Sequence, residues 1–109
     1  MKYEDLKREG LAYFNLLLHE DREKIVRLLR NNKMTTRQLA KTLKLHPSVV
    51  TYHLHILRLS GILGMATEKI APKRIRLVFY VNEEKLRKAL ETIKEFLEAF
   101  LRRWEIEGG

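Results

Sequence analysis

The sequence predicts a mainly α-helical fold with one small β-hairpin, in a single domain that spans residues 1–109. Three observations lead to this fold class. Apolar residues recur every three or four positions through most of residues 3–60, as on the buried sides of helices. After Gly61 the period changes to two, which is typical of strands. From residue 83 the helical period returns and continues to residue 104.

The composition indicates a soluble protein of the cytoplasm. The 109 residues include no cysteine, which excludes disulfides, thiolate metal sites and redox switching. The sequence contains no apolar run long enough to cross a membrane, and its N-terminus lacks the apolar stretch of a signal peptide.

The net charge of +8 is concentrated in the middle of the chain. Residues 32–82 contain nine Lys/Arg and one acidic residue, whereas residues 1–31 contain seven against six and residues 83–109 contain six against seven. A surface that only keeps a protein in solution explains the total charge but not its position. The position indicates a surface that faces phosphates.

Two helices are expected before residue 32. Residues 3–18 carry apolar side chains close to helical spacing, and Gly10 weakens this helix without preventing it. The next helix, residues 20–30, has acidic residues in its first turn and arginines near its end, which complements the helix dipole.

Residues 35–60 are predicted to form two helices joined by a tight turn. Thr35 can cap the first helix, residues 36–42, and Gln38 follows it at the spacing of a capping box. After a short turn, Pro47 fits the first position of the second helix, where its missing N–H costs nothing.

The second helix of this pair has two faces of different character. An apolar face should dock on the rest of the domain and contains Val50, Leu54 and Leu57. A polar face contains Ser48, Thr51, Tyr52 and His55. Such a face suits the polar edges of a DNA groove, but the solvated side of any amphipathic helix shows the same pattern, so the helix alone does not decide between them.

Residues 62–81 are expected to form a two-stranded hairpin. Its strands, residues 62–70 and 74–81, are separated by a turn that contains Pro72. Basic side chains on exposed strands protect sheet edges from aggregation, but their clustering near this tip favours contact with phosphates or a minor groove. The basic residues at the tip and on one flank are Lys69, Lys73, Arg74 and Arg76.

A long last helix is expected over residues 83–104, with Asn82 as its cap. Its apolar residues form a heptad seam. The core helix of a monomer can show the same stripe, but a chain of this size has little core left to cover it, so burial against a second copy is favoured. The first helix should join this interface, whose predicted residues are Leu6, Phe14, Leu86, Leu90, Ile93, Leu97, Phe100 and Trp104.

The run LKLHPSVVTYHLHILRLSGIL resembles the DNA-reading unit of the ArsR family of bacterial and archaeal repressors, and DREKIVRLL resembles the family's preceding helix. The resemblance covers roughly residues 11–100. It implies a winged helix-turn-helix in which residues 35–60 are the helix-turn-helix, the hairpin of residues 62–81 is the wing, and the N- and C-terminal helices (the latter residues 83–104) mediate dimerisation. The positions that carry the match are His53, Leu54, Leu57, Gly61 and Ile62.

The resemblance implies a homodimeric repressor, and we expect this one to be archaeal and to need no cofactor. Each subunit places one recognition helix in a major groove of double-stranded DNA. Carried over by position, the DNA contacts are Thr36, Arg37, Ser48, Val49, Thr51, Tyr52 and His55 on the helix pair, and Lys73, Arg74 and Arg76 on the wing.

Metal sensing, which is common in the ArsR family, is not expected of this chain, because it departs from the family pattern. Many ArsR members bind metal ions through cysteines near the recognition helix or through histidines and carboxylates on the last helix, and this chain has no cysteine and no histidine in its last helix. His53 and His55 lie two residues apart on a helix and therefore point about 200° apart, which suits one metal ion poorly. His53 should instead face the core, and His19 and His46 should lie at helix starts.

Two other functions stay open. One is a protein-interaction module built on the winged helix. The other is a regulator that responds to a small ligand held between the dimer helices by Phe96, Phe100 and Trp104, although dimer packing is the simpler explanation for these aromatic residues. An enzyme is not expected, because the motifs present supply no nucleophile with a base, no glycine-rich phosphate loop and no paired catalytic carboxylates.

Overall fold

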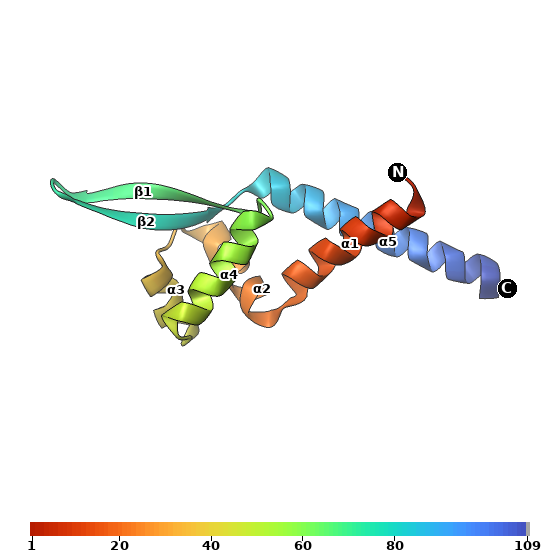
Figure 1. Ribbon diagram of the computed structural model, residues 1–109, viewed down its shortest axis with the longest axis horizontal. Helices are drawn as coiled ribbons and strands as arrows, with labels where there is room; N and C mark the ends of the chain where they lie inside the picture. Colours follow the sequence, from red (N-terminus) through yellow and green to blue (C-terminus); the bar gives the residue numbers. More distant parts are fainter. Residues whose placement is uncertain (109) are drawn as a thin grey trace.

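The computed structural model describes residues 1–108, which form an elongated molecule of 66 × 25 × 20 Å. The wing extends from one end, and the first and last helices run together at the other end, where both termini lie (Figure 1). No helix within these residues is long and apolar enough to span a membrane. The elements are α1 (Tyr3–Leu18), α2 (Glu20–Asn31), α3 (Thr36–Leu43), α4 (Pro47–Leu59), β1 (Leu63–Ala71), β2 (Arg74–Val81) and α5 (Glu83–Gly108).

The predicted fold class is confirmed, with small differences at element ends. The first strand begins and ends one residue later than expected, and the wing turn is therefore shorter. The last helix continues to Gly108 instead of ending at residue 104, because no proline or glycine interrupts it before that position.

The main core lies between α2, α3, α4 and the base of the wing. The apolar face predicted for α4 is confirmed, since Val50, Leu54 and Leu57 are all buried. Ile25 from α2 and Leu39 from α3 are fully buried in the same cluster. The burial of these side chains fixes the orientation of α4, and its opposite face is left on the surface.

Burial of the wing's side chains decreases with distance from its base, whereas the sequence predicts that buried and exposed residues alternate along each strand. Val78 and Phe79 point to opposite faces of β2, and both are buried. Ile75 and Leu77 share the face of Phe79 but are 68% and 50% exposed. The distal half of the hairpin extends beyond the helices (Figure 1), so neither of its faces has a layer to pack against.

Helix α1 packs along α5. Gly10 is buried at their contact, and a Cβ atom at this position would lie 2.5 Å from Cβ of Phe96. Phe96 is 5% exposed, and its ring centroid lies 6.4 Å from that of Tyr3. The close approach of the two helices depends on the missing side chain of Gly10.

Candidate nucleic-acid interface

Local hydrogen bonds position the first helix of the helix-turn-helix. The Thr35 hydroxyl accepts a hydrogen bond from the Gln38 backbone N–H at 3.1 Å, and the Gln38 side-chain oxygen accepts one from the Thr35 N–H at 2.8 Å. The capping box predicted from the sequence is therefore confirmed. It places Thr36 and Arg37 in the first turn of α3, where Arg37 is exposed and Thr36 is partly buried.

The turn between α3 and α4 uses a left-handed residue and a histidine cap. Lys44 has φ 57° and ψ 43°, and the Leu45 N–H donates to the Ala40 carbonyl at 3.0 Å. His46 then caps α4, because its Nδ1 accepts a hydrogen bond from the Ser48 backbone N–H at 3.1 Å. The expected position of His46 at a helix start is confirmed.

One side of α4 forms a continuous exposed surface, which we call the reading face. Tyr52 is 60% exposed and Val49 is 38% exposed. The Ser48 hydroxyl lies 2.8 Å from Nδ1 of His46 and keeps its acceptor lone pairs. The predicted contacts on this helix thus lie together on one side, and the reading face consists of Ser48, Val49, Thr51, Tyr52 and His55.

The basic residues of the wing differ in their surroundings. Lys73 is in the two-residue turn and Arg74 begins β2, and neither forms an ion pair within the part of the chain that the structure describes. Arg76 instead donates to the Glu68 carboxylate across the hairpin, at 2.6 and 3.0 Å. The pairing of Lys69 with Ile75 and of Glu68 with Arg76 puts Lys69 on the face opposite Arg76, so the basic residues do not share one flank.

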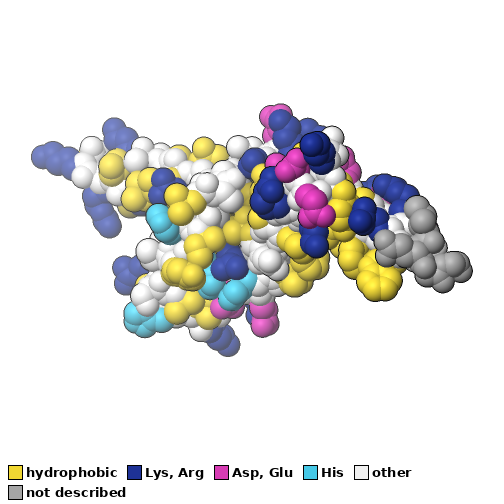
Figure 2. Space-filling view, turned by 45° about the vertical axis from the view of Figure 1, so that its right-hand side comes forward, with side chains coloured by type: hydrophobic (Ala, Val, Ile, Leu, Met, Phe, Trp, Pro, Cys, Tyr) yellow, Lys and Arg dark blue, Asp and Glu magenta, His cyan; other side chains and the backbone are white. Residues whose placement is uncertain are grey.

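Positive charge gathers at the free end of the wing, where Figure 2 shows dark-blue side chains projecting from the molecule. The acidic side chains lie over other parts of the molecule in the same view, closer to the end where α1 and α5 meet. The long helix α5 begins with Glu83 and Glu84, and α2 begins with three acidic residues. The charge separation seen along the chain is therefore also a separation in space.

A cluster of three side chains was not expected from the sequence. His53 is 4% exposed, as predicted for a histidine that faces the core. Its Nε2 lies 3.8 Å from Oδ2 of Asp21, and its ring centroid lies 4.5 Å from that of His19. Burial lowers the pKa of His53 below its usual range, the charges of His19 and Arg22 lower it further, and Asp21 acts in the opposite direction. Because 34 and 32 residues separate His53 from His19 and Asp21, spacing within one helix gave no signal for this cluster.

The protomer itself buries some residues of the predicted dimer seam and leaves others exposed. Leu86 is 5% exposed and belongs to the protomer's own core, and Phe96 is covered by α1. Little of Leu86 is therefore left for a partner, and Phe96 is not open to a ligand as suggested for it. Leu6, Phe14 and Ile93 are partly buried, whereas the seam residues that remain exposed are Leu90, Leu97, Phe100 and Trp104.

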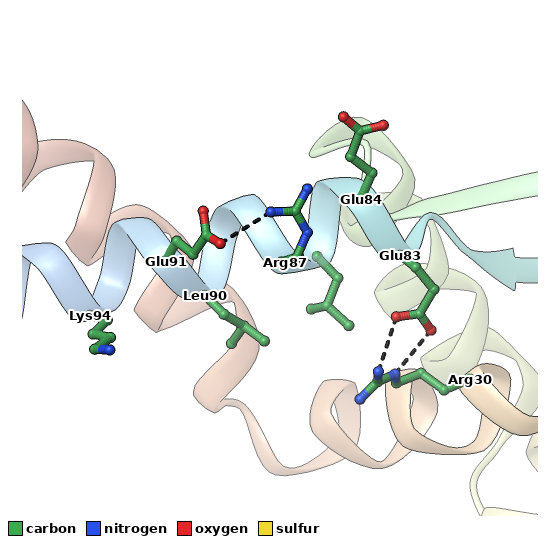
Figure 3. Close-up of a pocket in the computed structure, with 8 residues that line it drawn as sticks. Arg30, Glu83, Glu84, Arg87, Leu90, Glu91 and Lys94 are labelled. Atoms are coloured by element: carbon green, nitrogen blue, oxygen red, sulfur yellow. Dashed lines mark hydrogen bonds and ion pairs between the residues drawn. The ribbon is translucent and has the colours of Figure 1, made fainter.

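An open groove of about 640 Å³ lies beside the first half of α5 (Figure 3). Its walls carry the pair Arg30–Glu83, joined by two hydrogen bonds of 3.0 Å, and the pair Arg87–Glu91 at 3.1 Å. The hydrogen bond and charge of Glu83 raise the pKa of Arg30. Leu90 points into the space between these pairs (Figure 3), so the groove continues the exposed apolar stripe of α5.

Comparison with known proteins agrees with this geometry. Residues 19–63 match the family model described as "Bacterial regulatory protein, arsR family". A search of curated proteins found no match. An ArsR-like transcriptional regulator from Rhodococcus sp. RHA1 has a similar structure, with TM-score 0.65, 20% identity, and coverage of 91% of this chain and 89% of that one.

Two further solved structures have the same fold. Reduced HlyU from Vibrio cholerae N16961 superimposes with TM-score 0.59 and 24% identity over 80% of this chain and 88% of that one. A transcriptional regulator homologue from Pyrococcus horikoshii OT3 gives TM-score 0.61 and 20% identity over 87% and 95%. Residues 19–63 thus match the arsR family of bacterial regulatory proteins, and the chain has the winged helix-turn-helix fold of these solved structures.

Proposed function

We propose that the protein is a homodimeric repressor that binds a specific double-stranded DNA site through the reading face of α4. The observation that carries this proposal is that the exposed polar face of α4 belongs to residues 32–82, the segment that holds the excess of positive charge, and that basic side chains project from the wing next to it. Val50, Leu54 and Leu57 are buried, and the opposite side presents hydroxyl, phenol and imidazole groups to solvent. Groups of this kind hydrogen-bond to base edges and phosphates in a major groove.

The residues of the reading face have different proposed roles. Ser48 and Thr51 carry short hydroxyl groups that suit base edges or nearby phosphates. Val49 offers an apolar contact for a thymine methyl group. Tyr52 is 60% exposed and suits a phosphate or sugar. Repression follows from occupancy, since a dimer that covers a promoter excludes other proteins from it.

The wing and the start of α3 contribute contacts to the DNA backbone in this proposal. Lys73 and Arg74 lie at the end of the wing, where they reach phosphates that flank the major groove. Thr36 and Arg37 lie at the start of α3, where backbone N–H groups and the helix dipole favour a phosphate. Arg76 contributes only when it exchanges Glu68 for a phosphate.

The proposed dimer uses the stripe of α5 that the protomer leaves uncovered. Leu90, Leu97 and Trp104 are 50%, 39% and 63% exposed. Figure 2 shows hydrophobic side chains gathered near the end of the molecule where α1 and α5 meet. For one recognition helix of each subunit to enter successive major grooves, a two-fold dimer at this end has to hold the two helices about 34–36 Å apart, one turn of B-DNA.

The proposal is tested by selecting genomic fragments with purified protein at physiological salt and measuring affinities by fluorescence anisotropy. We expect a palindromic site whose half-sites are about one helical turn apart, with affinity that falls steeply as salt increases. Tyr52→Ala should weaken specific binding by about 1–3 kcal/mol, and Lys73→Ala should reduce the salt slope by about 1.

Lys7→Ala is the matched control, because it removes an exposed lysine from α1, at the end of the molecule opposite the wing. It should leave affinity and salt slope unchanged. Equal affinity for the selected and random DNA, or an equal loss in Lys7→Ala and Lys73→Ala, contradicts the proposal. A protein that is monomeric by light scattering at the concentrations used contradicts the dimer.

A further inference from the structure

We propose that His19, Asp21 and His53 form a binding site for a divalent transition-metal ion of the zinc class. We call these residues the His–Asp–His cluster. Each offers one ligand atom, and the three ligand atoms all lie within 4.8 Å of one another. Two imidazoles and a carboxylate are a ligand set that zinc accepts, with a water molecule in the fourth position.

The distances are close to those of a bound state. Tetrahedral zinc with ligand distances of about 2.0–2.1 Å holds its ligand atoms about 3.3–3.4 Å apart. Nε2 of His53 and Oδ2 of Asp21 are 3.8 Å apart, so this pair needs to approach by about half an ångström. Side-chain rotation alone can supply such a change at an exposed position.

Burial of the three residues suits a site with one fixed and two adjustable ligands. His53 is held within the core side of α4 and is 4% exposed. His19 is exposed, and the Asp21 side chain is 28% exposed, so both can adjust toward His53. Solvent reaches the cluster from the side of His19, where an ion can enter and a water molecule can complete the coordination.

Two hydrogen bonds must be exchanged when an ion binds. Nδ1 of His19 accepts from the Asp21 N–H at 3.2 Å and caps α2. Nη1 of Arg22 lies 3.3 Å from Nδ1 of His53. Because the arginine N–H can only donate, Nδ1 of His53 accepts this hydrogen bond and carries no proton. Coordination through Nε2 of His53 requires the proton on Nδ1, so Arg22 must leave this atom. The hydrogen bond of 2.7 Å from Arg22 Nε to the Leu16 carbonyl does not involve His53 and can remain.

The cluster connects the recognition helix with the corner between α1 and α2. His53 is on α4 directly after Tyr52 of the reading face, and the two rings are in edge contact with centroids 5.3 Å apart. His19 lies between α1 and α2, and Asp21 lies in the first turn of α2. An ion in this position therefore restrains α4 relative to the rest of the protomer. Its effect on DNA binding rests on the function proposed above.

The ion-binding experiment is done without DNA. Cobalt(II) is titrated into the purified full chain, and the visible absorption of tetrahedral cobalt is recorded, followed by competition with zinc. We expect one ion per chain. His19→Gln and Asp21→Asn should each weaken zinc binding by at least about tenfold, a magnitude typical even of residues that only support metal ligands.

His55→Gln is the matched control, because His55 is an exposed histidine on the same helix as His53 but lies outside the cluster. It should bind cobalt as the unaltered protein does. Circular dichroism of each variant checks that the helices are intact. Absence of saturable cobalt binding, unchanged affinity in both His19→Gln and Asp21→Asn, or an equal loss in His55→Gln would overturn the site.

A second measurement tests the coupling to DNA. Zinc should change the affinity for a selected DNA fragment at least severalfold in the unaltered protein and leave the affinity of His19→Gln unchanged. An equal response of both proteins overturns the coupling. Failure of the cobalt titration overturns the metal site even when specific DNA binding is found, and a protein that binds cobalt but no DNA overturns the proposed function instead.

Discussion

Gly10→Ala tests how closely α1 must approach α5. An added Cβ lies 2.5 Å from Cβ, 2.9 Å from Cγ and 3.0 Å from Cδ2 of Phe96, whereas carbon atoms in ordinary contact are about 3.5–4.0 Å apart. Rotation of the Phe96 side chain does not move its Cβ, which is attached to the backbone of α5. The two helices must therefore separate by about 1 Å.

Two effects of opposite sign decide the magnitude. Alanine is a better helix former than glycine by about 1 kcal/mol, which by itself stabilises the Gly10→Ala variant. Inserting a methyl group into a packed contact costs about 1–3 kcal/mol. We expect the contact to dominate, with a net decrease of about 1 kcal/mol in the free energy of unfolding.

Urea unfolding followed by circular dichroism measures this change. The measurement is repeated at several protein concentrations, because self-association would otherwise contribute to apparent stability. Ala12→Gly is the control at an exposed position of the same helix, and it should lose about 1 kcal/mol through helix propensity alone. If Gly10→Ala instead raises the free energy of unfolding by about 1 kcal/mol, α1 and α5 are not in close contact at Gly10.

Substitutions at four further positions have expected outcomes. Lys44→Gly should raise the free energy of unfolding by about 0.5–1 kcal/mol. The left-handed conformation of Lys44 costs about 1–2 kcal/mol for a residue with a Cβ and almost nothing for glycine. A lower free energy of unfolding, measured with urea, contradicts this prediction. Thr35→Ala should lower it by about 0.5–2 kcal/mol through loss of the cap, and Thr35→Ser, which keeps the hydroxyl, should retain most of the stability. Leu86→Ala should lower the free energy of unfolding by about 2–5 kcal/mol, because Leu86 is buried in the core of the protomer. Leu90→Ala should change the free energy of unfolding of the monomer by about 0.5 kcal/mol or less, but should weaken self-association measured by analytical ultracentrifugation. Equal effects of the two leucine substitutions on both measurements would mean that Leu86 and Leu90 do not differ in this way, with one in the protomer core and the other in the dimer interface.

Much of the helical framework could be predicted because its signals are local. The capping box of Thr35 and Gln38 and the position of Pro47 at the start of α4 involve residues at most a few positions apart. The two faces of α4 follow from the same helical periodicity that puts Leu54 in the core and Tyr52 in solvent. Such features are decided by backbone geometry within one turn of helix.

The wing shows where periodicity stops being informative. Ile75 and Phe79 lie on the same face of β2, so the alternating pattern of the sequence predicts the same burial for both. Phe79 is buried and Ile75 is exposed, because only the base of the hairpin has other elements against its faces. Alternation determines which residues share a face, whereas burial depends on what lies opposite.

The sequence by itself determined the order of helices and strands, the caps and the chemical character of the reading face, all of which follow from interactions between near neighbours. Only the tertiary structure showed which seam residues the protomer covers and that α1 approaches α5 closely at Gly10. It also showed that His53 lies next to His19 and Asp21. These outcomes depend on how distant segments pack against each other. A one-dimensional pattern specifies the faces that two helices offer, but the distance between particular atoms of those faces is set by the packing of the whole core.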